Sequence, residues 1–152
     1  MKEKRSILFV CTGNICRSPT AEAVLKDLAA KAALEVRIES AGIGDWHIGQ
    51  PPDERAQHHA RERGYDLSAQ RARQVHKRDF EEFDVILAMD RSHLEVLQEH
   101  CPPQHLGKLR MLVKGEDVPD PYHGGAEGFE RVLDMVEAAC RRLLHEMKTL
   151  TS

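Results

Sequence analysis

Hydrophobic residues along the chain follow two spacings, one typical of buried strands and one typical of amphipathic helices. Short apolar or alternating segments predict strands near 7–10, 35–39, 84–89 and 108–113. Apolar residues spaced three or four apart predict helices near 19–32, 92–99 and 126–147, and end signals predict a further helix near 53–63. Because strands and helices alternate, we expect an α/β fold. The expected fold is a single three-layer domain over residues 1–152, with a four-stranded parallel sheet of order 2-1-3-4 and helices on both faces.

The ends of two helices carry local signals. Ser18 and Pro19 predict that the first helix has Ser18 as its N-cap and Pro19 as its first helical residue. Asp53 is predicted to cap the second helix and Gly64 to end it. The charged segment 65–82 is expected to hold only short helical turns.

Composition and charge narrow the classes of function. The formal net charge of the 152 residues is only −3, which argues against a nucleic-acid or membrane partner. No apolar run is long enough to cross a bilayer, and the apolar part of MKEKRSILFV is too short for a signal peptide. We therefore expect a cytoplasmic protein.

The cysteines and histidines do not form a metal site. No C-x2-C pair and no matching histidine spacing is present among Cys11, Cys16, Cys101 and Cys140, so no metal is expected. Cys140 lies on the apolar stripe of the last helix and is predicted to be a packed core thiol. His58 and His59 lie in a strongly charged helix, where we expect them to be solvated.

The candidate chemistry lies in ILFVCTGNICRSPTA, residues 7–21, where a buried strand, a polar turn and a helix follow one another. Backbone N–H groups of such a turn converge on an anion, and the helix N-terminus adds partial positive charge. Arg17 adds a planar, two-pronged donor, and this field stabilises the thiolate of Cys11 as a nucleophile. Gly13 allows a positive φ and close approach of the ligand, and Asn14 can tolerate a left-handed backbone and brace the turn.

The segment CTGNICRSP resembles the signature loop of the low-molecular-weight protein tyrosine phosphatases, C-x-G-N-x-C-R-S-P. The resemblance implies hydrolysis of phosphotyrosine in proteins through a cysteinyl-phosphate intermediate, without a cofactor. It also implies that phosphate and other oxyanions inhibit. The implied catalytic residues are Cys11, Arg17 and Asp120, and the implied phosphate-binding residues are Thr12, Gly13, Asn14, Ile15, Cys16, Arg17 and Ser18.

The proton donor for the leaving oxygen is expected in the late loop. Asp117 and Asp120 are both candidates, and Asp120 is favoured because Pro121 stiffens the backbone behind it. An Asp-Pro pair alone is usually a turn. The preference for Asp120 is strengthened by the resemblance, because the family carries a D-P-[YF] acid before its last helix.

The resemblance also implies roles for residues around the loop. Trp46 and Tyr122 match the aromatic walls of the substrate cleft, although a tryptophan in this Gly-rich loop could instead serve packing. Loop support is implied for Asn14, Ser18 and Ser40. The chain departs from the family at Gln70, where many members have a bracing histidine, and at His123. Cys16 resembles the family's second loop cysteine, which can form a disulfide with the nucleophile; a small loop filler is an equal alternative.

Three other functions were weighed. Arsenate reduction needs two relay cysteines, and only Cys101 and Cys140 remain, far apart in the sequence. A protein arginine phosphatase is less favoured, because Ile15 and Tyr122 both fit the phosphotyrosine pattern. A non-catalytic oxyanion-binding module would need neither Cys11 nor Asp120. The sequence leaves the physiological phosphoprotein and the oligomeric state open.

Overall fold

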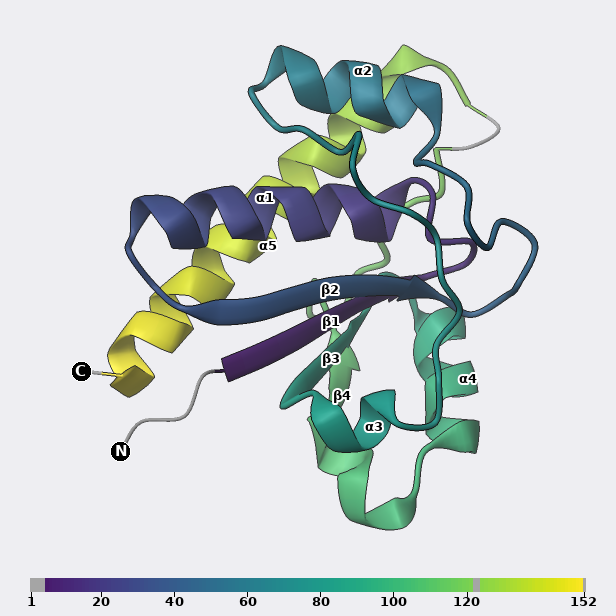
Figure 1. Cartoon of the computed structure of the whole chain (residues 1–152), viewed down its shortest axis with the longest axis vertical. Coiled ribbons are helices and arrows are strands. Elements are labelled where there is room, and N and C mark those ends of the chain that lie inside the picture. Colours follow the sequence, from purple (N-terminus) through teal and green to yellow (C-terminus); the bar gives the residue numbers. More distant parts are fainter. Residues whose placement is uncertain (1–4, 122–123, 152) are drawn as a thin grey trace.

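A twisted parallel sheet forms the centre of the molecule (Figure 1). The structure, a computed structural model, describes residues 5–121 and 124–151. Its strands are β1 (Arg5–Cys11), β2 (Val36–Gly42), β3 (Val85–Ala88) and β4 (Leu109–Met111). The strands are all parallel and lie in the order β2-β1-β3-β4, which confirms the predicted topology.

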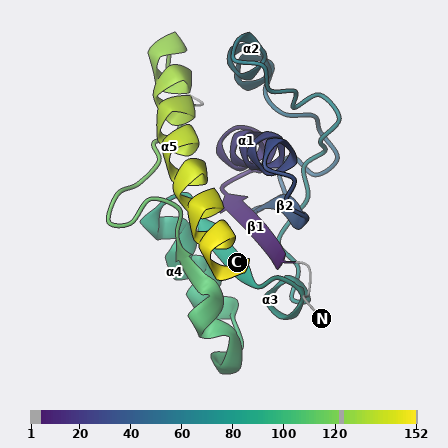
Figure 2. The same cartoon turned by 90° about the vertical axis from the view of Figure 1, so that its left-hand side faces the viewer.

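Helices cover both faces of the sheet (Figures 1 and 2). One side carries α1 (Arg17–Lys31), α2 (Glu54–Glu62) and α5 (Ala126–Thr151). The other side carries α3 (Asp79–Glu82), α4 (Arg91–His100) and the 3-10 helix η1 (Pro103–Lys108). Within the described residues, no helix is both long and apolar enough to cross a membrane.

The central strand β1 supplies both hydrophobic cores. Ile7 and Phe9 pack with α1 and α5, whereas Leu8 and Val10 pack with α3 and α4. Successive side chains of a strand point to opposite faces, so a strand buried on both sides is apolar throughout. Each fully buried side chain of this size contributes roughly 1.5–3 kcal/mol. These two cores hold the carboxyl end of β1 in place.

The first helix begins earlier than predicted. Arg17 is its first residue and Cys16 its N-cap, so the assignment of Ser18 as N-cap and Pro19 as first helical residue is wrong. The Ser18 side chain contacts Asn14 and Cys11 instead of a backbone N–H of the first turn. At α2 the prediction is confirmed, because the Asp53 carboxylate accepts from the Arg55 N–H.

Two side chains of the α-helical layer test other predictions. Cys140 is fully buried between α5 and α1, which confirms the packed core thiol. The prediction that both histidines of α2 are solvated is wrong for His59. Its ring stacks on Phe129 and its Nδ1 contacts the Glu130 carboxylate. The long helix α5 therefore covers a face of α2 that the sequence pattern presented as fully polar.

Candidate active site

The loop of residues 12–16 leaves the carboxyl end of β1 with its carbonyl groups turned outward. Neighbouring backbone N–H groups donate to the carbonyls of Cys11, Thr12 and Ile15 at 2.9, 3.0 and 2.8 Å. In the described part of the chain, no backbone carbonyl accepts from the N–H groups of residues 13–17. A loop with this polarity leaves its N–H groups available to an anion.

The loop backbone lies directly against β2. A Cβ at Gly42 would lie 3.0 Å from the Gly13 carbonyl carbon and 3.1 Å from the Asn14 nitrogen, so only glycine leaves room there. Asn14 has a φ of 59°, which confirms its left-handed conformation. Gly13 does not use the positive φ that a glycine allows. A Cβ at Gly13 would instead lie 2.7 Å from the His47 ring, so this glycine serves close packing at the pocket wall.

A pocket of about 200 Å³ opens above this loop. Cys11 and Arg17 are 2% and 3% exposed and lie deep in it, whereas Trp46 is 67% exposed and stands at the rim. Sequence reasoning missed His47 as a pocket residue. It could have been found because it directly follows Trp46 in the same loop. Asn14 and Ser18 are not in the lining. The residues that line the pocket are Cys11, Thr12, Gly13, Ile15, Cys16, Arg17, Trp46, His47 and Asp120. The predicted cleft residue Tyr122 lies outside the described residues.

The side chain of Asn14 braces the loop from behind. Its Nδ2 donates to the hydroxyls of Ser18 and Ser40, both at 2.9 Å. Its Oδ1 accepts from the Arg73 N–H at 3.0 Å. Both amide hydrogens and the amide oxygen are therefore used, and the side chain is buried.

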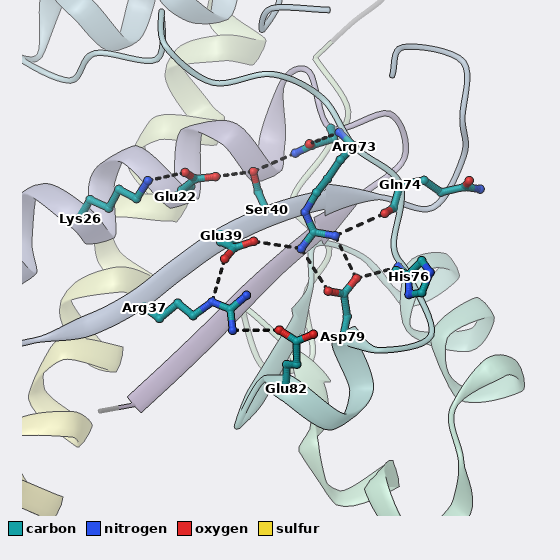
Figure 3. Close-up of polar contacts among 11 residues, drawn as sticks. Glu22, Lys26, Arg37, Glu39, Ser40, Arg73, Gln74, His76, Asp79 and Glu82 are labelled. Atoms are coloured by element: carbon teal, nitrogen blue, oxygen red, sulfur yellow. Dashed lines mark hydrogen bonds and ion pairs between the residues drawn. The ribbon is translucent and has the colours of Figure 1, made fainter. Parts of the chain in front are cut away.

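A buried carboxylate completes this brace. The Ser40 hydroxyl donates to Glu22 Oε1 at 2.6 Å, and Lys26 Nζ contacts Glu22 Oε2 at 2.6 Å. Figure 3 shows Ser40 of β2 pointing toward Glu22, which lies on α1 beside Lys26. Glu22 is 8% exposed, and the two contacts compensate for burying its charge.

Gln70 does not take the place of the histidine brace. Its Nε2 donates to the Pro19 carbonyl at 3.0 Å, and the backbone of Arg73 provides the contact to Asn14 Oδ1. The Asn14 amide is therefore satisfied without a contact from the side chain of Gln70.

Ser18 also contacts the sulfur of Cys11. Its Oγ lies 2.9 Å and its N–H nitrogen 3.4 Å from Cys11 Sγ. Ser18 Oγ accepts from Asn14 Nδ2, and its own hydrogen has two acceptors in reach, Cys11 Sγ at 2.9 Å and the Ala41 carbonyl at 3.5 Å, of which the sulfur is nearer. Ser18 thus offers the sulfur two hydrogen-bond donors, its O–H and its backbone N–H.

Arg17 is held by groups from three other segments. Its Nη1 donates to Asp90 Oδ2 and to the Val118 carbonyl, both at 3.0 Å, and its Nη2 donates to Thr12 Oγ1 at 3.0 Å. Burial raises the pKa of Asp90, but hydrogen bonds from Ser92 and from other neighbours outweigh it and hold that pKa below its ordinary value. Asp90 therefore stays ionised beside Arg17.

Sequence reasoning missed Asp90. The available signal was topological, because Asp90 follows the end of β3, the strand that neighbours β1. The carboxyl ends of adjacent parallel strands meet at one edge of the sheet, so a charged residue there faces the loop after β1.

The two acidic candidates of the late loop lie in different surroundings. Asp120 lines the pocket with its side chain 47% exposed, and its Oδ2 lies 3.7 Å from Arg17 Nη2. Asp117 accepts from the Arg91 N–H at 2.9 Å, at the start of α4, and is not in the lining. The geometry thus supports the preference for Asp120.

The second loop cysteine has a different environment from the first. Burial raises the pKa of the Cys16 thiol well above its ordinary value, and the charges of Asp53 and Cys11 add to this effect. Cys16 is therefore kept as a protonated thiol. Its pairing with Cys11 in a disulfide stays a prediction.

These features together define a class of protein. A thiol and a buried guanidinium share one pocket at the strand–loop–helix junction of a doubly covered parallel sheet, and outward-facing carbonyls leave the loop N–H groups for an oxyanion. The molecule belongs to the α/β proteins that carry a cysteine in an oxyanion-binding loop.

Comparisons with known proteins specify the family. The model of the low molecular weight phosphotyrosine protein phosphatase family matches residues 6–151. The low molecular weight protein-tyrosine-phosphatase YfkJ of Bacillus subtilis is 44% identical over 147 residues, covering 91% of this chain and 93% of its own. The corresponding phosphatase of Sus scrofa is 37% identical over 153 residues, with 95% and 96% covered.

Solved structures agree with these relatives. A crystal structure of the protein tyrosine phosphatase from Entamoeba histolytica, with Hepes in the active site, matches with a TM-score of 0.93 at 38% identity. That match covers 98% of this chain and all of the other. The crystal structure of YfkJ gives a TM-score of 0.92 at 39% identity, with 99% of each chain covered. The chain belongs to the low molecular weight phosphotyrosine protein phosphatase family.

Proposed function

We propose that this protein hydrolyses phosphotyrosine in proteins, and small aryl phosphates, through a cysteinyl-phosphate intermediate. The observation that carries the proposal is the shared pocket of Cys11, Arg17 and Asp120. A nucleophile, an oxyanion donor and a proton donor face one space, which is what cleavage of a phosphate ester requires.

In the first step, Cys11 Sγ attacks phosphorus in line with the leaving oxygen, forming an S–P bond as the P–O bond breaks. Arg17 and the loop N–H groups hold the other phosphoryl oxygens and stabilise their charge. The Ser18 hydroxyl, 2.9 Å from Cys11 Sγ, stabilises the sulfur as attacking and as leaving group.

Asp120 supplies and then removes a proton. Its exposed position at the pocket rim suits transfer to a phenolate that departs toward solvent. As a carboxylate it then takes a proton from the water that attacks phosphorus and releases Cys11 and inorganic phosphate. A bell-shaped pH dependence is expected, because thiolate and protonated carboxyl must coexist.

The open pocket supports an aryl substrate. Trp46 stands at the rim as a flat, exposed wall against which a phenyl ring can stack, with the phosphate reaching the buried Cys11. Inorganic phosphate and other oxyanions are expected to compete for the same loop. The cytoplasmic location inferred from the sequence stays a prediction.

Arsenate reduction is disfavoured by the positions of the remaining cysteines. Cys101 packs in the core on the α4 side of the sheet, whereas Cys140 packs in the core on the α5 side. A disulfide relay from Cys11 through these two thiols would have to cross the sheet.

Turnover of p-nitrophenyl phosphate and of a phosphotyrosine peptide tests the proposal. Cys11→Ser should abolish both activities while binding of phosphate persists. Asp120→Asn should lower kcat on the phosphotyrosine peptide by roughly 10²–10⁴-fold and remove the alkaline limb of the pH profile. The effect on p-nitrophenyl phosphate should be smaller, because its leaving group needs less protonation.

Asp117→Asn is the matched control, since it makes the same substitution in the same loop. It should leave turnover of both substrates within about threefold of wild type. Equal losses in Asp117→Asn and Asp120→Asn would refute the assignment of the acid. An unmutated protein that binds phosphate without any turnover would refute the function and favour the oxyanion-binding module.

A further inference from the structure

The guanidinium of Arg17 has five N–H hydrogens, and the protein uses three of them. Both Nη1 hydrogens are taken by Asp90 Oδ2 and the Val118 carbonyl, and one Nη2 hydrogen is taken by Thr12 Oγ1. Among the described residues, none accepts a hydrogen bond from the Nε–H or from the second Nη2 hydrogen. Nε and Nη2 lie on one edge of the planar group, the edge that can bind two oxygens of a phosphate in parallel.

The Thr12 hydroxyl has a second partner that determines its orientation. Because an arginine only donates, Thr12 Oγ1 is the acceptor in its contact with Arg17. Its own hydrogen is then directed to His93 Nε2, which lies 2.7 Å away. Asp90 Oδ1, which lies 3.3 Å from His93 Nδ1, favours the tautomer with its ring hydrogen on Nδ1, in which Nε2 accepts from Thr12.

The contacts return to Arg17 through Asp90. The His93 backbone N–H donates to Asp90 Oδ1 at 3.0 Å, and His93 Nδ1 lies 3.3 Å from the same oxygen without the alignment of a hydrogen bond. The other carboxylate oxygen, Asp90 Oδ2, accepts from Arg17 Nη1. We call this closed set of Arg17, Thr12, His93 and Asp90 the arginine ring.

His93 meets the protonation state that the arginine ring needs. It is 4% exposed, and burial together with the charge of Arg17 lowers its pKa to about 4 despite the opposing charges of Asp90, Asp120 and Asp117. The imidazole is thus neutral near pH 7 and can accept from Thr12.

We propose that Thr12 and His93 are positioning residues that orient the Nε–Nη2 edge of Arg17 toward the phosphoryl group. The inference deepens the proposed function and rests on it. A guanidinium held only at Nη1 can pivot about that nitrogen. The contact at Nη2 fixes its plane, and His93 keeps the Thr12 oxygen lone pair, not its hydrogen, facing Arg17.

Substitutions at Thr12 separate positioning from packing. Thr12→Val removes the hydroxyl with almost no change in volume, and Thr12→Ser keeps the hydroxyl while removing a methyl group. We expect Thr12→Val to weaken inorganic phosphate binding, and to lower kcat/KM for the phosphotyrosine peptide, by roughly 10–100-fold, the value of a hydrogen bond to a charged group. Thr12→Ser should stay within about threefold of wild type. Should Thr12→Val fail to fold, Thr12→Ala removes the same hydroxyl with less bulk.

His93 is tested in the same way. His93→Leu removes the acceptor and should resemble Thr12→Val, whereas His93→Gln, whose Oε1 can accept, should restore part of the activity. His100→Leu on the same helix is the control and should match wild type. Because the two residues act as one unit, Thr12→Val combined with His93→Leu should be little worse than either alone. Thermal melts of each variant report folding.

Two results would overturn the proposal. One is a Thr12→Val protein with wild-type phosphate affinity, and the other is a Thr12→Ser protein as impaired as Thr12→Val. Failure of the proposed function looks different, because it removes turnover from the unmutated protein. In that case, calorimetric titration still measures the phosphate affinity of each variant, and this affinity reports whether Thr12 and His93 position Arg17.

Discussion

The oxyanion loop is held from two sides by different chemistry. The Asn14 side consists of Asn14, Ser18, Ser40 and Glu22 with the Arg73 backbone, and its contacts to Asn14 are between an uncharged amide and hydroxyl or backbone groups. The Arg17 side is the arginine ring with the Val118 carbonyl, and it joins a cation, a carboxylate and a histidine.

The two sides differ in what they leave unused. The amide of Asn14 is fully satisfied within the protein, so the Asn14 side fixes the shape of the loop before any ligand arrives. Arg17 keeps one edge for a ligand. Loss of the Asn14 side should therefore reduce stability and activity together, and loss of the Arg17 edge should reduce activity with little effect on stability.

Arg17→Lys should have the largest effect on activity, and it tests the Arg17 side. Lysine keeps the positive charge beside Asp90 but replaces the two-pronged edge by a single point charge. We expect kcat/KM for p-nitrophenyl phosphate to fall by about 10³-fold, typical of losing a main oxyanion donor. The melting temperature should fall only moderately, because lysine gives up the contacts to the Val118 carbonyl and to Thr12 but keeps its charge beside Asp90. Steady-state kinetics and thermal melts of the same preparations measure both quantities.

Arg91→Lys serves as the control, because Arg91 is an exposed residue at the start of α4. It should match wild type in both measurements. An Arg17→Lys protein that loses most of its stability would contradict the division of labour, since Arg17 would then be part of the structural brace.

Sequence reasoning identified the Asn14 side more readily than the Arg17 side. The loop motif places Cys11, Asn14 and Ser18 within eight residues of one another, so local spacing and the family resemblance were enough. The strand order was also predictable, because buried apolar runs joined by helices allow few topologies. The start of the first helix was less predictable than the strand order. Residue propensity favours Ser18 as an N-cap, but it cannot reveal that the Ser18 side chain contacts Cys11 and Asn14 instead.

The Arg17 side depends on contacts between distant segments. His93 lies 81 residues from Thr12 along the chain, and Val118 lies 101 residues from Arg17. His93 follows Arg91 and Ser92 at the start of a helical pattern and looks like a surface residue in the sequence. Its burial arises only because β3 ends beside β1, which directs the start of α4 toward the loop.

Asn14→Ala should have the next largest effect, and it tests the Asn14 side. Alanine loses the hydrogen bonds of the amide and must still adopt a φ of 59°. We expect a loss of about 4 kcal/mol in the free energy of unfolding, from about 1 kcal/mol for each of the three hydrogen bonds and about 1 kcal/mol for the left-handed backbone. Urea denaturation measures this loss, and kcat/KM should fall in parallel.

Asn14→Gly separates the two contributions, because glycine adopts a positive φ without steric cost. It should recover about 1 kcal/mol relative to Asn14→Ala while activity stays low. If Asn14→Gly equals Asn14→Ala in stability, the backbone conformation costs nothing and the argument reduces to the amide contacts.

The pH dependence of stability gives the smallest effect and distinguishes the sides by their chemistry. The pKa of His93 is lowered to about 4 in the folded protein, so the unfolded chain binds more protons than the folded one between about pH 4 and 6.5. The free energy of unfolding therefore falls as the pH falls through that window. For His93 alone the loss between pH 7 and pH 5 is about 2 kcal/mol.

His93→Gln removes this contribution while keeping an acceptor for Thr12. Urea denaturation at pH 7 and pH 5 should thus show a smaller difference for His93→Gln than for wild type. Asn14→Ala, on the Asn14 side, should lower stability at both values but keep the wild-type difference, because the Asn14 amide contacts hydroxyl and backbone groups and no titrating imidazole. Equal pH differences in wild type and His93→Gln would mean that His93 titrates normally in the folded state, and an arginine ring built on a neutral imidazole would then be untenable.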